Sequence, residues 1–144
     1  MTDQKQKRNF REEAEKLDKE NREKWHNLLN SDEELLDEDG YPTEHACKVI
    51  ESWHWSDVDG WFNFIKNIWQ HRSLTWQFQD ELHSWKKDVL VKRLYVSTFG
   101  WSGNETLIRA MKQNDMLWHN TWYQSNRGGH YIFEVEDEDD ELVV

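Results

Sequence analysis

Cysteine, proline and long hydrophobic runs are nearly absent from this 144-residue chain, and each absence excludes a class of protein. The single cysteine, Cys47, excludes an intramolecular disulfide and fits a reducing compartment. No apolar run approaches the length of a membrane span, and the opening residues lack the apolar stretch of a signal peptide. We therefore expect a cytoplasmic protein that has no membrane partner.

Metal-ligand and nucleotide-binding motifs are also missing. The seven histidines and one cysteine show no H-x-x-x-H, C-x-x-C or H-E-x-x-H spacing. No G-x-S-x-G motif, P-loop or Rossmann fingerprint occurs in the sequence. We expect no metal and no cofactor, a structural role for His54, and a buried, unreactive thiol at Cys47.

Basic residues are outnumbered, and the net charge of −11 is concentrated at the two ends of the chain. Residues 1–40 carry a net charge of −5, residues 134–144 carry −7, and residues 41–133 between them carry +1. Nucleic acid is excluded as the main partner, because a near-neutral body lacks the basic groove that such a ligand requires. The acidic ends either confer solubility or attract a basic protein surface.

Aromatic residues are abundant, with ten Trp, six Phe and four Tyr, and they supply the core of one domain. We divide the chain into a charged N-terminal helix with an acidic linker (1–40), a Trp-rich body (41–135) and an acidic C-terminal tail (136–144). The stripe Phe10, Ala14 and Leu17 in the first segment continues to Trp25 and Leu28, with polar Asn21 interrupting it. This stripe suits packing against the body or against a dimer partner, and it is too short to define a coiled coil.

The body alternates between helical and extended patterns. Helical spacing predicts helices that begin at Pro42 and after a cap at Ser56, and a shorter helix over 104–114. Alternation and β-branched residues predict strands within 74–82 and 88–101, and a hairpin over 116–136 that turns at 126–129. The expected fold class is α+β, with N-terminal helices followed by a mainly antiparallel four-stranded sheet and one inserted helix (α-α-α-β-β-α-β-β). The positions expected to face the core are Ala46, Val49, Ile50, Trp53, Val58, Trp61, Phe62, Ile65, Ile68, Trp69, Trp76, Leu107, Ile108, Met111, Trp118 and Trp122.

Four of the six glycines lie in two short stretches, "GWSGNE" at 100–105 and "RGGH" at 127–130. A capping box between Ser102 and Glu105, and a tight hairpin loop at Gly128 and Gly129, explain both stretches structurally. Alternatively, the two loops meet and bind an anionic or nucleotide-like small molecule, for which Arg127 would offer a planar fork. The candidate ligand-binding residues are then Trp101, Ser102, Asn104, Glu105, Arg127, His130 and Tyr131.

Tryptophans at the ends of elements are candidates for partner contact, because exposed Trp often anchors an interface. Together with the acidic tail they form the candidate partner-binding set, which is Trp55, Trp85, Trp101, Glu136, Asp137, Glu138, Asp139, Asp140 and Glu141. This set predicts a small acidic, non-enzymatic interaction protein, monomeric or homodimeric, that binds a basic protein surface. An enzyme acting through Glu105, Arg127 and His130 is a weaker alternative, and we assign no catalytic residue.

The stretches "YPTE", "WSGNETLI", "MLWHNTWYQS" and "RGGHYIFEV" together resemble a family of small uncharacterised proteins from bacteriophages and mobile elements. The resemblance covers the body, from Tyr41 to Val135, and it brings no assigned activity. It implies a role in phage–host conflict, such as inhibition of a bacterial defence protein or capture of its signal molecule.

Overall fold

The computed structural model describes residues 2–83 and 85–136, and for residues 2–6, 8 and 136 it describes the backbone only. The elements follow one another as α1 (Thr2–Leu29), α2 (Glu44–Ser52), α3 (Val58–Ile68), α4 (Arg72–Thr75), β1 (Trp76–Leu82), β2 (Leu90–Ser97), α5 (Ser102–Gln113), α6 (Asp115–Thr121), β3 (Trp122–Asn126) and β4 (His130–Glu136). No helix in this part of the chain is both long enough and apolar enough to cross a membrane.

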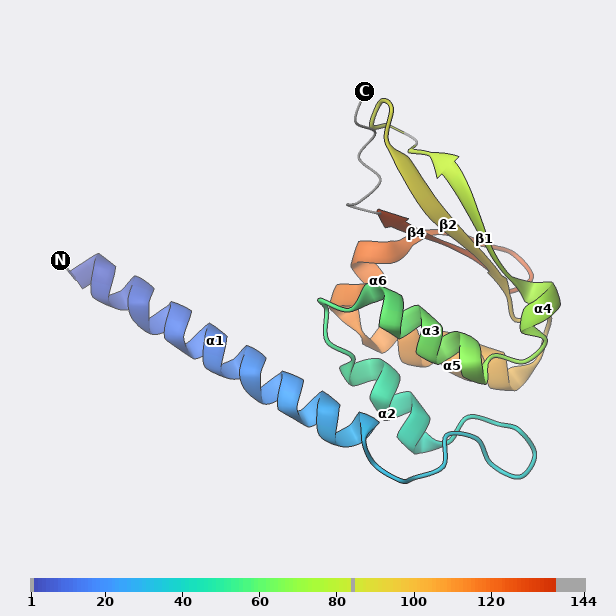
Figure 1. The fold of residues 1–144 in the computed structure, drawn as a ribbon, viewed down its shortest axis with the longest axis horizontal. Coiled ribbons are helices and arrows are strands. Elements are labelled where there is room, and N and C mark those ends of the chain that lie inside the picture. Colours follow the sequence, from blue (N-terminus) through green and yellow to red (C-terminus); the bar gives the residue numbers. More distant parts are fainter. Residues whose placement is uncertain (1, 84, 137–144) are drawn as a thin grey trace.

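The four strands form one open antiparallel sheet in the order β1-β2-β4-β3, and the helices gather on one face of it (Figure 1). This arrangement confirms the expected α+β class. Strand β2 is central, since Leu94 pairs with Phe78 of β1 on one side and with Phe133 of β4 on the other. The outer strands β1 and β3 are the two edges of the sheet.

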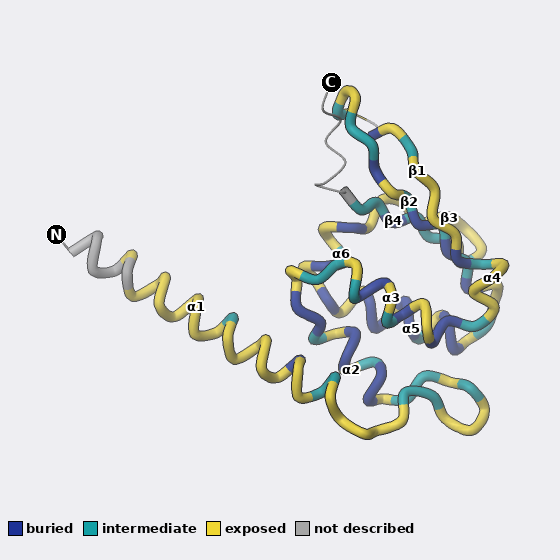
Figure 2. The backbone as a smooth tube through the Cα atoms, in the orientation of Figure 1, coloured by how far each residue is buried: buried dark blue, intermediate teal, exposed yellow. Residues whose placement is uncertain are grey.

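The core lies between this sheet and the helices. Phe133 of β4 is fully buried, and its ring centroid is 5.4 Å from those of both Phe62 in α3 and Trp118 in α6. The buried positions of α2, α3 and α5 follow the helical spacing in the sequence, so the periodicity located these faces correctly. Figure 2 shows the buried segments concentrated in this layer.

Two helix starts differ from the prediction by one or two residues. The N-cap of α2 is Thr43, whose hydroxyl accepts from the Ala46 N–H, so Pro42 precedes the helix. The N-cap of α3 is Asp57, whose carboxylate accepts from the Gly60 N–H. The positive end of the helix dipole also stabilises a carboxylate at this position. This stabilisation explains why Asp57, and not Ser56, is the cap.

Helix α6 replaces the first part of the expected hairpin over 116–136, and the first arm is reduced to β3, which pairs with β4. Asn114 starts this helix by accepting from the Leu117 N–H, and its amide also donates to the carbonyls of Ile50 and Trp53 at 3.0 Å. Trp118 therefore lies on a helix and is half-buried. The prediction that Trp122 faces the core is wrong, because this residue opens the edge strand β3 and is 44% exposed.

Helix α1 leaves the body as a long arm, and only its C-terminal part packs (Figure 1). Trp25 is buried, with its ring centroid 5.0 Å from that of Trp53. Phe10 and Leu17, which lie nearer the N-terminus on the same stripe, are 72% and 57% exposed. The linker that follows α1 folds back on itself through an isolated antiparallel β-bridge between Leu36 and Pro42.

Candidate functional site

The β1–β2 hairpin ends in a turn that presents one tryptophan to solvent. Nδ1 of His83 accepts hydrogen bonds from the backbone N–H groups of Trp85, at 3.2 Å, and Lys86, at 3.0 Å. The Trp85 ring stands edge-on to the His83 ring at a centroid distance of 4.8 Å. Trp85 is nevertheless 77% exposed. The turn therefore holds a large apolar side chain in a defined position in solvent.

His83 is itself fixed by the sheet beneath it. Its side chain is 3% exposed, and Nε2 lies 3.1 Å from Oε1 of Glu134 on β4. Because Nδ1 accepts backbone hydrogen bonds, Nε2 carries the proton and donates to this carboxylate. The orientation of Trp85 thus depends on a residue of another strand.

A charged network surrounds this contact on the sheet face opposite the helices. Arg93 donates to Glu81 at 2.6 Å and to Glu134 at 3.4 Å, and its guanidinium stacks 4.5 Å over the Tyr123 ring. The Tyr95 hydroxyl donates to Glu81 at 2.6 Å. This hydrogen bond and partial burial raise the pKa of Tyr95. The network ties β1, β2 and β4 together below the turn.

Further apolar side chains are exposed along β1, on the other face of the hairpin. Phe78 is 46% exposed and Leu82 is 66% exposed, although both share the inward parity of buried Trp76. The end of the β1–β2 hairpin projects past the helical layer (Figure 1). We call Phe78, Leu82 and Trp85, with the turn that carries Trp85, the hairpin arm.

The acidic C-terminal segment starts beside the hairpin arm. Strand β4 runs antiparallel to β2, and its last residue, Glu136, pairs with Val91 next to the turn. The predicted partner residues Asp137, Glu138, Asp139, Asp140 and Glu141 lie outside the described residues, as does the side chain of Glu136. Their point of departure from the sheet is the end that carries Trp85.

The two other predicted contact tryptophans lie elsewhere. Trp55 is 50% exposed, and its indole N–H donates to Asp18 at 3.2 Å. Trp101 follows β2 whereas Trp85 precedes it, so these two side chains lie at opposite ends of that strand. Trp101 is half-buried and stacks on Tyr41 at 5.0 Å. Of the three, Trp85 lies in the turn that precedes β2, at the end of that strand where Val91 pairs with Glu136.

The second glycine-rich stretch contacts the residue that follows β2, two positions before the first stretch begins. The Thr98 N–H donates to the carbonyl of Gly129 at 2.9 Å. Gly129 has φ of +78°, and a Cβ there would collide with the Thr98 hydroxyl, so this close approach requires glycine. The sequence could not show this contact, because it depends on the pairing of β2 with β4.

Of the side chains predicted for a ligand at the start of α5, Asn104 and Trp101 make contacts within the protein, whereas Ser102 and Glu105 are exposed. Asn104 is fully buried, accepting from the Gln70 N–H at 3.0 Å and donating to the Gln70 carbonyl at 3.2 Å. Trp101 is the N-cap residue and makes no side-chain cap, so the predicted capping box of Ser102 with Glu105 is wrong. Glu105 is exposed in the first turn of the helix.

The residues from the other stretch remain at the surface. Arg127 and His130 are exposed, and His130 borders a shallow hollow of about 400 Å³ with Ser97 and Asn126. Tyr131 is half-buried beside Trp118, at a ring distance of 6.3 Å. At this end of the sheet Arg127 and His130 are therefore accessible to an anion, whereas Asn104 is buried and not accessible.

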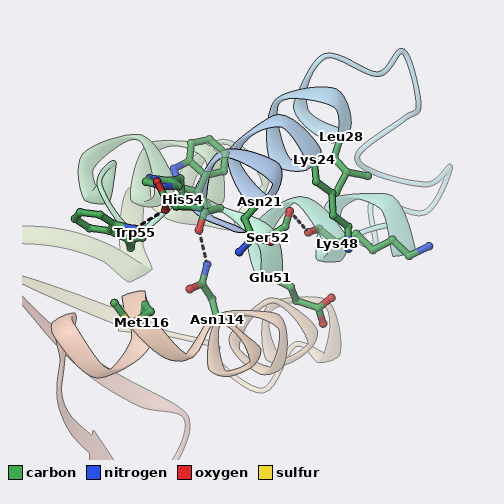
Figure 3. Close-up of a pocket in the computed structure, with 12 residues that line it drawn as sticks. Asn21, Lys24, Leu28, Lys48, Glu51, Ser52, His54, Trp55, Asn114 and Met116 are labelled. Carbon is green, nitrogen blue, oxygen red and sulfur yellow. Dashed lines mark hydrogen bonds and ion pairs between the residues drawn. The ribbon is translucent and has the colours of Figure 1, made fainter. Parts of the chain in front are cut away.

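A hollow of about 660 Å³ lies between α1, α2 and the start of α6 (Figure 3). On its wall Nε2 of buried His54 contacts Asp18 of α1 at 2.8 Å, and Nδ1 contacts the Ser56 hydroxyl at 2.6 Å. The hydrogen bonds from His54 and then from Trp55 lower the pKa of Asp18. Ser56, His54 and Asp18 are hydrogen-bonded in the order found in a Ser–His–Asp catalytic triad. The lining of the hollow includes His54 and Asp18 but not Ser56, so a substrate there would not reach the hydroxyl. We therefore interpret His54 as the residue that docks α1.

Other reactive groups are few in the part of the chain that the structure describes. No group of three or more His, Cys, Asp or Glu side chains in residues 2–83 and 85–136 is arranged to hold a metal ion. Burial raises the pKa of the Cys47 thiol, which disfavours the nucleophilic thiolate.

Sequence reasoning missed the residues that position Trp85. His83, Arg93 and Glu134 lie on three different segments, and their contacts depend on strand register. The available signal was weak: β2 and β4 carry residues of opposite charge, and the register of the sheet then pairs Arg93 with Glu134.

Comparison of the chain with protein families, with curated protein sequences and with solved structures finds no match. The functional argument therefore depends on the geometry described above.

Proposed function

We propose that this protein is a non-enzymatic interaction protein whose hairpin arm and adjoining acidic segment bind a basic surface on a partner protein. The observation that carries the proposal is the position of Trp85, which is 77% exposed and yet held against His83 by ring and backbone contacts. Tryptophan is enriched among the residues that dominate binding energy. An anchor that is already ordered loses less conformational entropy on binding.

The charge distribution supports a basic partner. Residues 136–141 are all acidic, and they follow β4 at the end of the sheet that carries Trp85. A run of six acidic residues in the sequence would attract a basic surface over several ångströms, and Trp85 could then dock on that surface. This attraction should weaken as salt screens the charges.

The phage–host setting belongs to the proposal and rests on the resemblance of the body motifs alone. In that setting the partner is a bacterial protein, such as a component of host defence, and binding takes place in the cytoplasm. The inhibitory effect would then follow from occupation of a basic surface of the partner.

Affinity capture from bacterial lysate with quantitative mass spectrometry tests the proposal. We expect the full chain to enrich a partner, and Trp85→Ala or deletion of residues 137–144 to reduce that enrichment at least about tenfold. Trp122→Ala is the matched control, because Trp122 is also exposed but lies on the opposite edge strand. Equal enrichment by Trp85→Ala and the full chain would refute the role of the hairpin arm.

A second candidate function is the binding of an anionic small molecule at the opposite end of the sheet. The Thr98–Gly129 hydrogen bond holds the loop at residues 127–130 against the end of β2, and Arg127 and His130 are exposed there. Inorganic phosphate and adenosine monophosphate are suitable probes in a thermal-shift titration. Stabilisation that Arg127→Ala abolishes would support this site, and no stabilisation of the full chain by either probe would remove it.

A further inference from the structure

The N-terminal half of α1 exposes apolar side chains that nothing in the described chain covers. Phe10 is 72% exposed and Leu17 is 57% exposed, whereas Trp25, further along the helix, is buried by the body. Phe10, Ala14 and Leu17 share one face of α1, at the alternating spacing of four and three residues that helix–helix seams use. The helix over residues 2–17 is about 24 Å long at 1.5 Å per residue.

The charge of α1 is divided along its length into two opposite halves. Residues 2–11 carry four basic residues and one acidic residue, for a net charge of +3. Residues 12–23 carry six acidic and three basic residues, for a net charge of −3. An arm of this kind is complementary to a copy of itself that runs in the opposite direction. Parallel pairing would instead place like charges beside each other.

We propose that the occupant of this apolar stripe is α1 of a second copy, packed antiparallel about a two-fold axis near residue 12. In that arrangement Phe10 of each copy lies opposite Ala14 of the other, and the aliphatic stem of Lys7 covers Leu17. A two-fold axis makes the interface closed and self-complementary, so the assembly ends at a dimer. The interface spans the projecting part of α1 and leaves Trp25 in its own body.

Dimerisation would also change how the protein binds a partner. The β1–β2 hairpin lies away from the N-terminal half of α1 (Figure 1), so each dimer would carry two accessible copies of the hairpin arm. Two linked anchors raise the apparent affinity for a partner that offers two sites. The dimer goes beyond the proposed function and does not depend on it.

Sedimentation velocity of the full chain over micromolar concentrations tests the dimer. We expect a monomer–dimer equilibrium, and the double variant Phe10→Asp/Leu17→Asp should raise the dimer Kd more than about 100-fold. Leu74→Asp is the matched control, because Leu74 is 78% exposed on α4 and should leave the Kd unchanged. A monomer at all concentrations, or a dimer that the double variant leaves intact, would overturn the proposal.

Disulfide trapping tests the direction of the helices in a Cys47→Ser background. In the antiparallel pair the two copies of residue 20 lie about 24 Å apart along the axis, whereas residue 20 lies near residue 6 of the other copy. A mixture of Gln6→Cys and Glu20→Cys chains should therefore form the mixed disulfide, and Glu20→Cys alone should form none. Rapid oxidation of Glu20→Cys to a symmetric dimer would indicate parallel helices and would contradict the proposal.

The outcome is separable from that of the proposed function. The double variant of α1 keeps Trp85 and the acidic segment, so it should still enrich the same partner from lysate. If the double variant loses the dimer and still enriches the partner, both proposals are supported. If Trp85→Ala remains dimeric and loses the partner, the result supports the hairpin arm independently of the dimer.

Discussion

Asn104 shows how one buried amide decides between a structural and a ligand-binding role. The residue follows a glycine-rich turn, so the sequence made it a candidate ligand contact. In the structure its side chain completes both backbone hydrogen bonds of Gln70, in the connection between α3 and α4. An amide that is fully buried and already bonded through both its oxygen and its nitrogen is not accessible to a ligand.

Asn104→Ala should destabilise the fold by about 2–4 kcal/mol, because the Gln70 N–H and carbonyl would lose their partners inside the protein. Chemical denaturation monitored by circular dichroism measures this difference. Ser102→Ala is the matched control, and it should change the free energy of unfolding by less than about 0.5 kcal/mol, since the capping box is not formed. A large loss of stability from Ser102→Ala would contradict the observed N-cap at Trp101.

His83 plays the corresponding part at the other end of the sheet. Its Nδ1 accepts from two backbone N–H groups of the turn, and its Nε2 donates to Glu134. His83→Ala removes these contacts and the ring that supports Trp85. We expect about a tenfold loss of partner affinity with the sheet retained, measured by titration calorimetry with the captured partner. An unchanged affinity would mean that Trp85 needs no positioning.

Among the elements, α1 is held to the body by a polar contact at Asp18 in addition to the packing of Trp25. His54 and Trp55 both donate to Asp18, and these hydrogen bonds lower the pKa of that carboxyl below its usual value. A lowered carboxyl pKa means that the contact stabilises docking above the usual carboxyl pKa. The stabilisation is lost as the pH falls through the lowered pKa.

Hydrogen exchange of α1 measures this dependence. Residues 18–29 should exchange severalfold faster in Asp18→Ala than in the full chain near neutral pH, because the helix loses its contact with His54. The two chains should become alike in acid, once Asp18 is protonated. Arg22→Ala is the matched control, since its side chain is half-exposed and pairs only with Asp18 at 3.5 Å. Equal exchange in Asp18→Ala and the full chain at neutral pH would contradict the docking role of His54.

The elements also show how far the sequence predicts this fold. The spacing of Trp61, Phe62 and Ile65 predicted α3 and its buried face, because a strong helical period has no competing explanation. The pair Trp118 and Trp122 misled the prediction, because positions four apart share a face in both a strand and a helix. Asn114 decides between them as an N-cap, through contacts with Ile50 and Trp53 that are distant in sequence.

The sequence predicted less of the candidate site than of the fold. Exposure of Trp55 and Trp85 could be predicted from their places at the ends of elements, and both are exposed. That the chain's last acidic run begins beside Trp85 could not be predicted, because it requires the register in which Glu136 pairs with Val91. Strand register depends on packing between residues that are distant in sequence, and this packing cannot be read from the local pattern of a single sequence.

The whole molecule consists of a compact helix–sheet body with two projections, the helix α1 and the β1–β2 hairpin (Figure 1). Each projection exposes large apolar side chains, Phe10 and Leu17 on the helix and Leu82 and Trp85 on the hairpin. Exposed apolar groups of this size usually mark sites of protein contact. At this scale the two proposals assign the helix to a second copy and the hairpin to a different protein.

Site-specific photo-crosslinking in bacteria tests the central claim most directly. A photoreactive amino acid replaces Trp85 in one chain and Trp122 in another, and crosslinked products are identified by mass spectrometry. The account predicts that position 85 crosslinks one bacterial protein with a basic surface, that high salt in a matched lysate experiment reduces the yield, and that position 122 does not crosslink it. Absence of a product from position 85, or the same product at equal yield from position 122, would contradict the account.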